Sequence, residues 1–370
     1  MKKFCAKRCV AAVFACAAIS VFSVLSVGCS KTEDPTTQTV VSYVSTDSRV
    51  QSSTADVVAD VADTVVEIST ETVKTQWGAQ YIVSGAGSGV IIGKSGSLYY
   101  IVTNNHVIAG ANDINVFTRG GVEYSASLVA TDDSADIAVI TVSTSDTLKI
   151  ATWGNSDSLS IGEDLIAIGN PLGSLGGTVT KGILSATGRT ITVGDFAMTL
   201  LQTDTAINPG NSGGGLFNMR GELIGVVNAK TSDEEIEGIC FAIPSNTAKD
   251  VCDDLMRLGY LEGRATLPIT VVEGALSSGM NTQAQTIVYV TDATGAASNT
   301  FKQYDRIYKI NGEQISSIVE YNAALAKLSP GESVAVQVFR GSKSQSMWGN
   351  NITFASDVTE FTVTALQYGA

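Results

Sequence analysis

Histidine is almost absent from this sequence. A single one, His106, occurs among the 370 residues. A zinc site built from several histidines is therefore excluded, and any reaction that needs an imidazole base must use His106. Cysteine is also scarce after the first 29 residues, where only Cys240 and Cys252 remain, so no Cys/His cluster is available for a metal. We expect no metal and no other cofactor.

Positive charge is in short supply as well. The 23 Lys and Arg residues are outnumbered by 36 Asp and Glu residues, which gives a formal net charge of −13. We expect no nucleic-acid partner, because no basic patch is available to neutralise phosphates. Proline is rare, with 6 residues, whereas glycine is abundant, with 36, and 44% of the chain is hydrophobic. This composition favours a β-rich chain with tight turns and a sizeable core.

The first 29 residues have a composition of their own. Basic residues at the start are followed by an uncharged apolar run from residue 9 to residue 28 and then by Cys29. This pattern is typical of an export signal, and the run is long enough to serve as a membrane anchor. Residues 25–29 resemble a bacterial lipobox, in which Cys29 would be lipidated. We favour a lipoprotein over an uncleaved anchor or simple secretion. All three place the body of the chain outside the cytoplasm, at the cell surface or in the periplasm.

Composition divides the chain into four parts. These are an export segment at 1–29, a flexible linker at 30–55, a first folded domain at 56–260 and a smaller domain at 265–370. The first domain consists of short β-branched runs separated by Gly, Asn and Asp. This pattern predicts a β-barrel or a β-sandwich.

One helix is predicted at the end of the first domain. Its apolar pattern begins after Ser245 or Asn246, either of which can serve as N-cap, and Gly259 can serve as C-cap. Cys252 lies on this helix and Cys240 on the preceding strand. Export would permit a disulfide between them, but we interpret both as buried free thiols.

The strongest local chemical signal is Gly210-Asn211-Ser212-Gly213-Gly214. Glycine next to Ser212 permits a tight turn and lets backbone N–H groups point at a developing oxyanion. The same residues fit the G-x-S-x-G elbow of α/β-hydrolases, in which the histidine follows the serine. Here the only histidine precedes Ser212. The order His, Asp, Ser of the chymotrypsin arrangement therefore fits better.

Such an arrangement needs an acid that orients the imidazole. Asp132, Asp133 and Asp136 lie close together, just before the apolar run Ile137–Ile140. Asp136 directly precedes this run, so it can be buried at the mouth of a strand. We expect Asp132 and Asp133 in a solvated turn, which leaves Asp136 as the candidate.

Three segments together resemble the catalytic motifs of the HtrA/Deg family of serine proteases: Thr103–His106, Ala135–Ile140 and Asn208–Gly214. Further matches occur at Ala167–Gly173, Gln202–Ile207 and Phe241–Ser245, and the likeness runs from about residue 60 to residue 258. The resemblance implies a mainly β, chymotrypsin-like double β-barrel over 56–260. It also implies Ser212 as nucleophile, His106 as base and Asp136 as orienting acid, with the N–H groups of Gly210 and Ser212 as the oxyanion hole.

The family likeness also suggests the substrate pocket. Ala206, six residues before the serine, lies where an acid selects Lys or Arg in chymotrypsin-like proteases. Because alanine has no charge, we predict cleavage after small or medium apolar residues. Val227, Asn228 and Ala229 are the predicted pocket wall, and the loop at 230–237 corresponds to a segment that helps to switch the family's site on.

The second domain resembles a PDZ domain, an α+β fold. Tyr304–Glu313 matches the core motif of that family, which binds peptide C-termini as an added strand. The carboxylate-binding loop is predicted at Thr266–Ile269. Proline at position 268 replaces the family's glycine and removes one N–H donor. Two alternatives therefore remain for this domain. It binds peptide C-termini, or it is a degenerate PDZ domain that serves only in packing.

The glycine-rich run Gly85–Gly89 is interpreted as part of a hairpin. It does not fit a phosphate-binding loop, because Ser88 occupies a required glycine position. The loop before it, near residues 77–84, is short. Family members with long loops there form large cages, so the resemblance implies a homotrimer or a smaller assembly.

The resemblance leaves three functional hypotheses. The first is an extracytoplasmic protease that degrades unfolded or misfolded proteins in quality control and the stress response. The second is a protease that cuts one specific partner after a signal peptide binds. The third is a chaperone or peptide-binding scaffold with little proteolysis. We favour the first.

Overall fold

A computed structural model describes residues 53–76, 78–169, 177–208, 210–229, 238–276, 285–346 and 349–369. The predicted export segment, the lipidation residue Cys29 and most of the predicted linker lie outside these residues. Among the residues that are described, no helix combines the length and the apolar character needed to cross a membrane. The first element is helix α1 (Thr54–Val61), which Ser53 and Asp56 cap reciprocally, followed by the 3₁₀ helix η1 (Ala62–Thr64).

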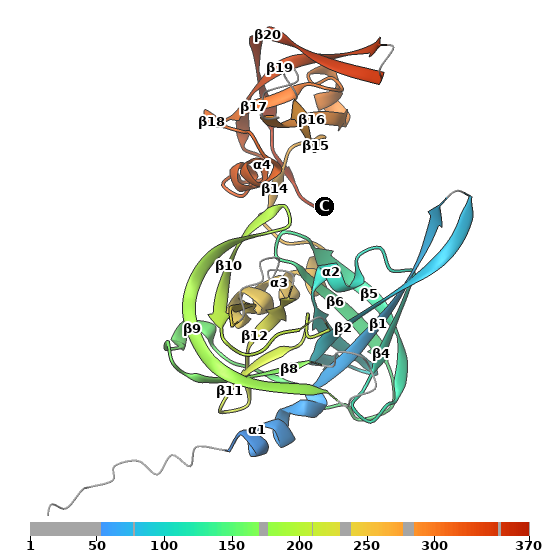
Figure 1. Cartoon of the computed structure of the whole chain (residues 1–370), viewed down its shortest axis with the longest axis vertical. Coiled ribbons are helices and arrows are strands. Elements are labelled where there is room, and N and C mark those ends of the chain that lie inside the picture. Colours follow the sequence, from blue (N-terminus) through green and yellow to red (C-terminus); the bar gives the residue numbers. More distant parts are fainter. Residues whose placement is uncertain are drawn as a thin grey trace, which may run out of the picture. The chain divides into compact units, whose positions relative to one another are not determined.

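The first sheet closes into a barrel. Its strands are β1 (Val65–Gln76), β2 (Ala79–Ser95), β3 (Leu98–Thr103), β4 (Asp113–Phe117), β5 (Glu123–Asp132) and β6 (Ile137–Ser143). They follow the order β1-β2-β3-β6-β5-β4, and β4 pairs with β1 to close the ring. The β1–β2 hairpin extends beyond the barrel (Figure 1). Gly87 and Gly89 pair with Ile68 and Val66 inside this hairpin, which confirms the interpretation of the glycine-rich run.

The second barrel follows in the chain. It contains β7 (Thr152–Trp153), β8 (Asp164–Gly169), β9 (Thr178–Val193), β10 (Phe196–Thr203), β11 (Gly215–Asn218), β12 (Glu222–Asn228) and β13 (Cys240–Pro244). The strand order is β11-β8-β9-β10-β13-β12-β7, and a further pairing of β11 with β12 closes the ring. The short 3₁₀ helix η2 (Ser156–Ser158) precedes β8. Fully buried aliphatic side chains fill this barrel, among them Leu165, Leu184 and Ile224.

The predicted helix is α3 (Ser245–Leu258), and it ends at Gly259 with a left-handed φ of 83°. The prediction of its N-cap was wrong, because Pro244 occupies that position. The Ser245 hydroxyl instead donates to the carbonyl of Gly154, at 2.9 Å, which removes it from the helix end. The apolar face of α3 packs into the main core cluster. Cys240 and Cys252 are free thiols, as predicted, and Cys252 is buried, but the prediction that Cys240 is buried was wrong because it is only partly covered.

The C-terminal domain has its own sheet and its own core. Its elements are β14 (Ala265–Thr266), β15 (Ile269–Leu276), β16 (Gln285–Ala293), η4 (Gly295–Asn299), β17 (Arg306–Ile310), β18 (Glu313–Gln314), α4 (Ile318–Leu325), β19 (Ser333–Ser346), β20 (Gly349–Thr364) and β21 (Leu366–Gln367). The main sheet has the order β15-β16-β17-β19-β20, so β15 is an edge strand, and β14 pairs separately with β21. Fully buried valines such as Val288, Val334 and Val336 form the core under α4.

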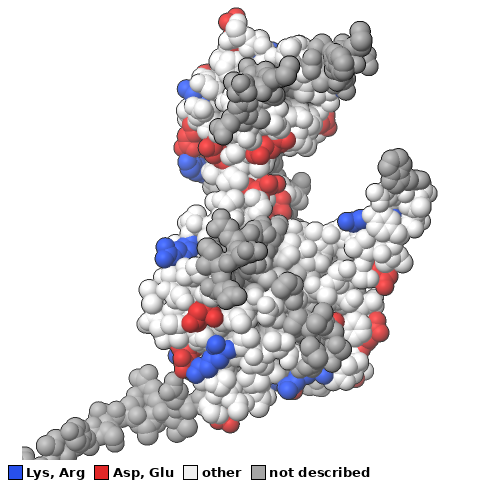
Figure 2. All heavy atoms as spheres, in the orientation of Figure 1, with Lys and Arg blue, Asp and Glu red and all other residues white. Residues whose placement is uncertain are grey.

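Charged residues are spread thinly over the face of the molecule that Figure 2 shows. In Figure 2, Lys, Arg, Asp and Glu lie in small groups separated by uncharged atoms. This agrees with a charged fraction of only 16%.

Candidate active site

The three predicted catalytic residues come from three separate segments. His106 lies in the short helix α2 (Asn105–Ile108), which begins two residues after the end of β3. Asp136 lies in the turn between β5 and β6, and Ser212 lies in the loop before β11. The first barrel therefore supplies the imidazole and the carboxylate, whereas the second barrel supplies the hydroxyl.

Asp136 is the most constrained of the three. Its φ of 49° is in the left-handed region, which is unfavourable for a residue with a Cβ. Only 5% of the residue is exposed. Its backbone carbonyl accepts hydrogen bonds from Asn105 N (3.2 Å) and Asn104 Nδ2 (3.0 Å). These contacts hold a strained backbone in place, so the carboxylate has one fixed direction.

The carboxylate of Asp136 contacts His106 through both oxygens. Oδ1 accepts the backbone N–H of His106 at 2.9 Å, and Oδ2 lies 2.7 Å from Nδ1 of the ring. A carboxylate at this distance favours the tautomer with the proton on Nδ1. The other ring nitrogen, Nε2, is then an acceptor that can take a proton.

Asn228 completes the contacts of the carboxylate. Its Nδ2 donates to Oδ2 of Asp136 at 2.9 Å, and only 1% of Asn228 is exposed. Sequence reasoning placed Asn228 in the substrate pocket and missed this contact. Asn228 ends β12 of the second barrel, so the bond joins the two barrels at the site.

The hydroxyl of Ser212 is not hydrogen-bonded to His106 in this structure. Ser212 is 7% exposed, and its Oγ accepts the N–H of Ala229 at 3.4 Å. The structure thus joins Asp136 to His106 and leaves the third contact open. Such contacts are often long in substrate-free proteases and shorten when substrate binds.

Ser88, on β2 of the first barrel, contacts the serine loop twice. Its N–H donates to the carbonyl of Ser212 at 2.8 Å, and its Oγ donates to the carbonyl of Gly210 at 2.7 Å. A Cβ on Gly213, whose φ is 80°, would lie 2.2 Å from the Ser88 carbonyl oxygen. Glycine at 213 is therefore required for the close approach of the two barrels. No sequence motif pointed to Ser88 beyond its place between two glycines.

The loop leaves two backbone donors available. Gly210 has a φ of 98°, which glycine adopts without strain. Neither the Gly210 N–H nor the Ser212 N–H donates to an acceptor in the part of the chain that the structure describes. Two unpaired donors beside a serine hydroxyl are suited to bind an oxyanion.

The predicted pocket residues differ in their surroundings. Ala206 is exposed, and its carbonyl accepts Thr180 Oγ1 at 3.0 Å. Val227 is buried and its backbone pairs with Gly213 and Gly214, at 2.9 Å in each case. Ala229 contacts Ser212, as described above. The loop predicted at 230–237 lies outside the described residues.

One further side chain lies beside Ala206. The thiol of Cys240 lies close to the backbone of Ile207, the residue that follows Ala206. Burial raises the pKa of this thiol, so it stays protonated at neutral pH. A small, neutral group therefore lies near the position that would carry an acid in a protease specific for Lys or Arg.

The chain is similar to known proteases over most of its length. Residues 87–226 match the family of trypsin-like peptidase domains, and residues 274–347 match the PDZ domain family. Serine protease Do-like HtrB of Bacillus subtilis is 38% identical over 323 residues, which cover 80% of this chain and 70% of that protein. Serine protease Do-like HtrA of the same organism is 38% identical, with 71% and 62% covered.

A solved structure, the HtrA-type protease AlgW with a decapeptide, is also similar. It is 30% identical and superposes with a TM-score of 0.55, covering 86% of this chain and 99% of that one. These likenesses confirm the predicted fold class, a mainly β chymotrypsin-like domain followed by a PDZ-like domain. The chain is therefore a serine endopeptidase and belongs to the HtrA family of trypsin-like serine proteases.

Proposed function

We propose that Ser212, His106 and Asp136 form the catalytic triad of an extracytoplasmic quality-control protease. The observation that supports this most is the 2.7 Å contact between Nδ1 of the only histidine and the buried carboxylate of Asp136. That contact leaves Nε2 as the base. Membership of the HtrA family supports a protease function in protein quality control outside the cytoplasm.

In the proposed reaction, Nε2 of His106 takes the proton from Oγ of Ser212 as the oxygen attacks the substrate carbonyl. The N–H groups of Gly210 and Ser212 then bind the oxyanion. The imidazolium, stabilised by Asp136, gives its proton to the leaving amine. His106 then takes a proton from a water molecule, whose oxygen attacks the acyl carbon. The imidazolium returns its proton to Oγ of Ser212 as the ester bond breaks, which releases the acid product.

The open contact between Ser212 and His106 favours an enzyme that is activated on binding. For catalysis, the hydroxyl must leave the N–H of Ala229 and reach Nε2 of His106. A substrate or a signal peptide that stabilises this state would raise activity. This keeps the second hypothesis, a regulated protease that acts on one partner, as the alternative.

The proposed substrates are unfolded or misfolded proteins cut after small or medium apolar residues. Ala206 offers no charge to a Lys or Arg side chain, and the adjacent Cys240 thiol is neutral. The similar HtrA-type protease AlgW is solved with a decapeptide, which supports a peptide or protein substrate. Val227, Asn228 and Ala229 would form the pocket wall next to Ser212.

We propose that the PDZ-like domain binds peptide C-termini, with a weakened contribution from the terminal carboxylate. Strand β15 is at the edge of its sheet, so an extended peptide can pair with it. The predicted carboxylate loop has lost two donors, because Pro268 has no N–H and the N–H of Ile269 donates to the carbonyl of Leu267 at 2.7 Å. The backbone of the peptide would therefore contribute more than its carboxylate.

We propose a protease domain over 56–260 and a PDZ-like domain over 265–370, tethered through a lipid on Cys29, with a homotrimer as the assembly. Palmitate labelling of the native chain and of Cys29→Ser would test the tether. Sedimentation of the exported form would test the trimer.

The proposed activity is tested with casein as an unfolded substrate. The native chain is expected to degrade casein, and Ser212→Ala is expected to be inactive. A Ser212→Ala protein that still suppresses aggregation of unfolded clients would support the chaperone hypothesis. Casein that stays intact while one partner is cut after addition of a signal peptide would support the regulated protease.

A further inference from the structure

The sheet of the PDZ-like domain carries a row of side chains on the face away from its core. Each member is the register partner of the next, so the row crosses five strands: Val272 on β15, Tyr289 on β16, Arg306 on β17, Phe339 on β19 and Val358 on β20. Directly paired residues share a face of the sheet. Their chain neighbours Val288 and Ile307 are fully buried in the core. The row therefore lies on the opposite face.

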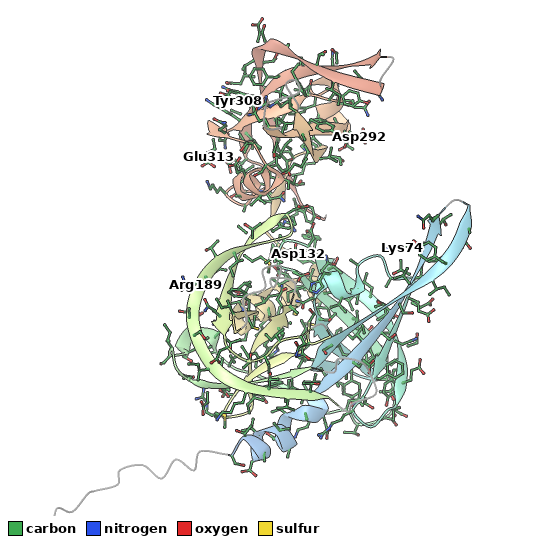
Figure 3. The ribbon with its side chains drawn as sticks, in the orientation of Figure 1. Lys74, Asp132, Arg189, Asp292, Tyr308 and Glu313 are labelled. Carbon is green, nitrogen blue, oxygen red and sulfur yellow. The ribbon has the colours of Figure 1, made fainter. Side chains whose placement is uncertain are left out.

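The row is largely apolar and open to solvent. The valines at its two ends are 37% and 43% exposed, and the residues between them are half-buried. Two further rings extend it. Tyr304 lies 6.3 Å from Tyr289 between ring centres, and Tyr308, labelled in Figure 3, lies 4.9 Å from Phe339. Contiguous exposed apolar surface of this kind is typical of a binding surface.

Arg306 is the one charged member of the row. Its guanidinium lies 5.6 Å from the ring centre of Phe339, and its Nε is buried and meets no acceptor among the described residues. Burial lowers the pKa of Arg306, and the interaction that opposes this shift comes from Tyr308, not from a carboxylate. An arginine that is partly desolvated is usually paired with an acid. A carboxylate brought by a partner would supply the missing counter-charge.

The charges around the row also favour an acidic partner. The Nζ of Lys309 lies 5.2 Å from the ring centre of Tyr308, and the Nζ of Lys343 lies 5.9 Å from that of Tyr304. Two residues beyond the valine of β20, the carboxylate of Glu360 accepts Nε2 of Gln337 at 2.7 Å. Positive charge thus gathers beside these rings in a chain whose net charge is −13. Complementary charge steers and selects partners.

The dimensions of the row define the shape of the partner. Neighbouring strands lie about 4.8 Å apart, so a row across five strands is about 19 Å long, which is the length of roughly six residues of extended chain. A segment laid along the row would place apolar side chains on the valines at its ends and a carboxylate at Arg306 in its centre.

We propose that this row is a docking site for an extended segment of an unfolded polypeptide that carries carboxylates flanked by apolar residues. The site differs from the edge of β15, because it needs neither strand addition nor a free C-terminus. The inference rests on the proposed function for its role, the retention of an unfolded substrate, whereas the binding itself needs no cleavage.

The test measures binding to the full chain with Ser212→Ala, which cannot cut the probe. The probe is a fluorescein-labelled, C-terminally amidated peptide with a pair of glutamates between leucines, followed by fluorescence anisotropy. In this background, Arg306→Gln is expected to weaken binding about tenfold, because a charge-assisted contact is lost. A probe with glutamine in place of glutamate should lose a similar factor, and added salt should weaken binding of the acidic probe.

Arg189→Gln is the matched control for charge. Arg189, labelled in Figure 3, is exposed on β9 of the protease domain, and its loss changes the net charge equally. We expect native affinity in this variant. The proposal is overturned if Arg306→Gln keeps native affinity, if Arg189→Gln weakens binding as much, or if the glutamine probe binds as tightly as the acidic one.

A second pair of variants covers the case in which Arg306→Gln does not fold. Val358 is exposed, so Val358→Glu and Val358→Lys change the charge at the end of the row without opening the core. We expect the glutamate variant to bind the probe several-fold more weakly than the lysine variant. Equal affinities overturn the proposal.

Other occupants give different results. An oligothymidylate that binds through Arg306 while the acidic peptide does not would overturn the proposal in favour of a nucleic acid. Self-association that is lost in Arg306→Gln, measured by sedimentation, would overturn it in favour of a second copy of the chain. Failure of the proposed function looks different, because casein would stay intact with the native chain while the probe still binds to Ser212→Ala.

Discussion

Asn228 donates a hydrogen bond of 2.9 Å to Oδ2 of Asp136, the same oxygen that faces the ring of His106. The donor comes from the second barrel and the acceptor from the first. The orientation of the acid therefore depends on the packing of both barrels.

Asn228→Ala is expected to lower kcat by roughly tenfold to a hundredfold, because a hydrogen bond to a charged group contributes about 1.5–3 kcal/mol. Steady-state kinetics on a cleaved peptide measures the effect. Asn246→Ala is the control, since that side chain bonds to Asn155 at the surface, at 2.8 Å. A native kcat in Asn228→Ala would show that the hydrogen bond from Asn228 is not needed to orient the carboxylate of Asp136.

Ser88→Ala removes the hydroxyl that donates to the carbonyl of Gly210 but keeps the backbone bond to Ser212. We expect kcat to fall about fivefold, in line with about 1 kcal/mol for a neutral hydrogen bond. The control is Ser97→Ala, whose hydroxyl has, among the described residues, only a long, exposed contact with Ser143, at 3.4 Å. Equal rates for both variants would contradict a role of Ser88 in holding the oxyanion loop.

Ala206→Asp tests the substrate pocket. A carboxylate at this position is expected to raise the ratio of kcat/KM for Lys over Val at the cleaved position by about tenfold, a change of ~1.4 kcal/mol. Peptide pairs that differ only at that residue provide the measurement. Ala197→Asp, on β10, controls for the added charge. An unchanged ratio would mean that Ala206 does not lie in the pocket.

Pro268→Gly tests the carboxylate loop of the PDZ-like domain. The native chain is expected to bind a peptide with a free C-terminus and its amidated form with similar affinity. The glycine variant regains an N–H, and we expect it to prefer the free carboxylate by about tenfold, as one charge-assisted hydrogen bond allows. Fluorescence anisotropy with both peptides measures this. A strong preference in the native chain would refute the idea that the loop has lost its donors.

Sequence reasoning predicted much of the fold and the contact between His106 and Asp136. The strands could be predicted because turn glycines and β-branched runs are local features of the sequence. The catalytic arrangement could be predicted because the chain order His, Asp, Ser fits the chymotrypsin arrangement and not the α/β-hydrolase elbow. The contacts of Ser88 and Asn228 could not be predicted, because they exist only where the two barrels pack together. The prediction that Asp132 lies in a solvated turn was wrong for a similar reason. Asp132 is buried and paired with Arg264, which is 132 positions away in the chain.

The central claim is that Ser212 is activated by His106. The most direct measurement is mass-spectrometric mapping of the adduct formed with a fluorophosphonate probe, under resting conditions and with an unfolded substrate present. We predict one adduct, on Ser212, which is lost in His106→Ala although Ser212 is still there. An adduct that forms equally fast without His106, or no adduct under either condition, would contradict the account.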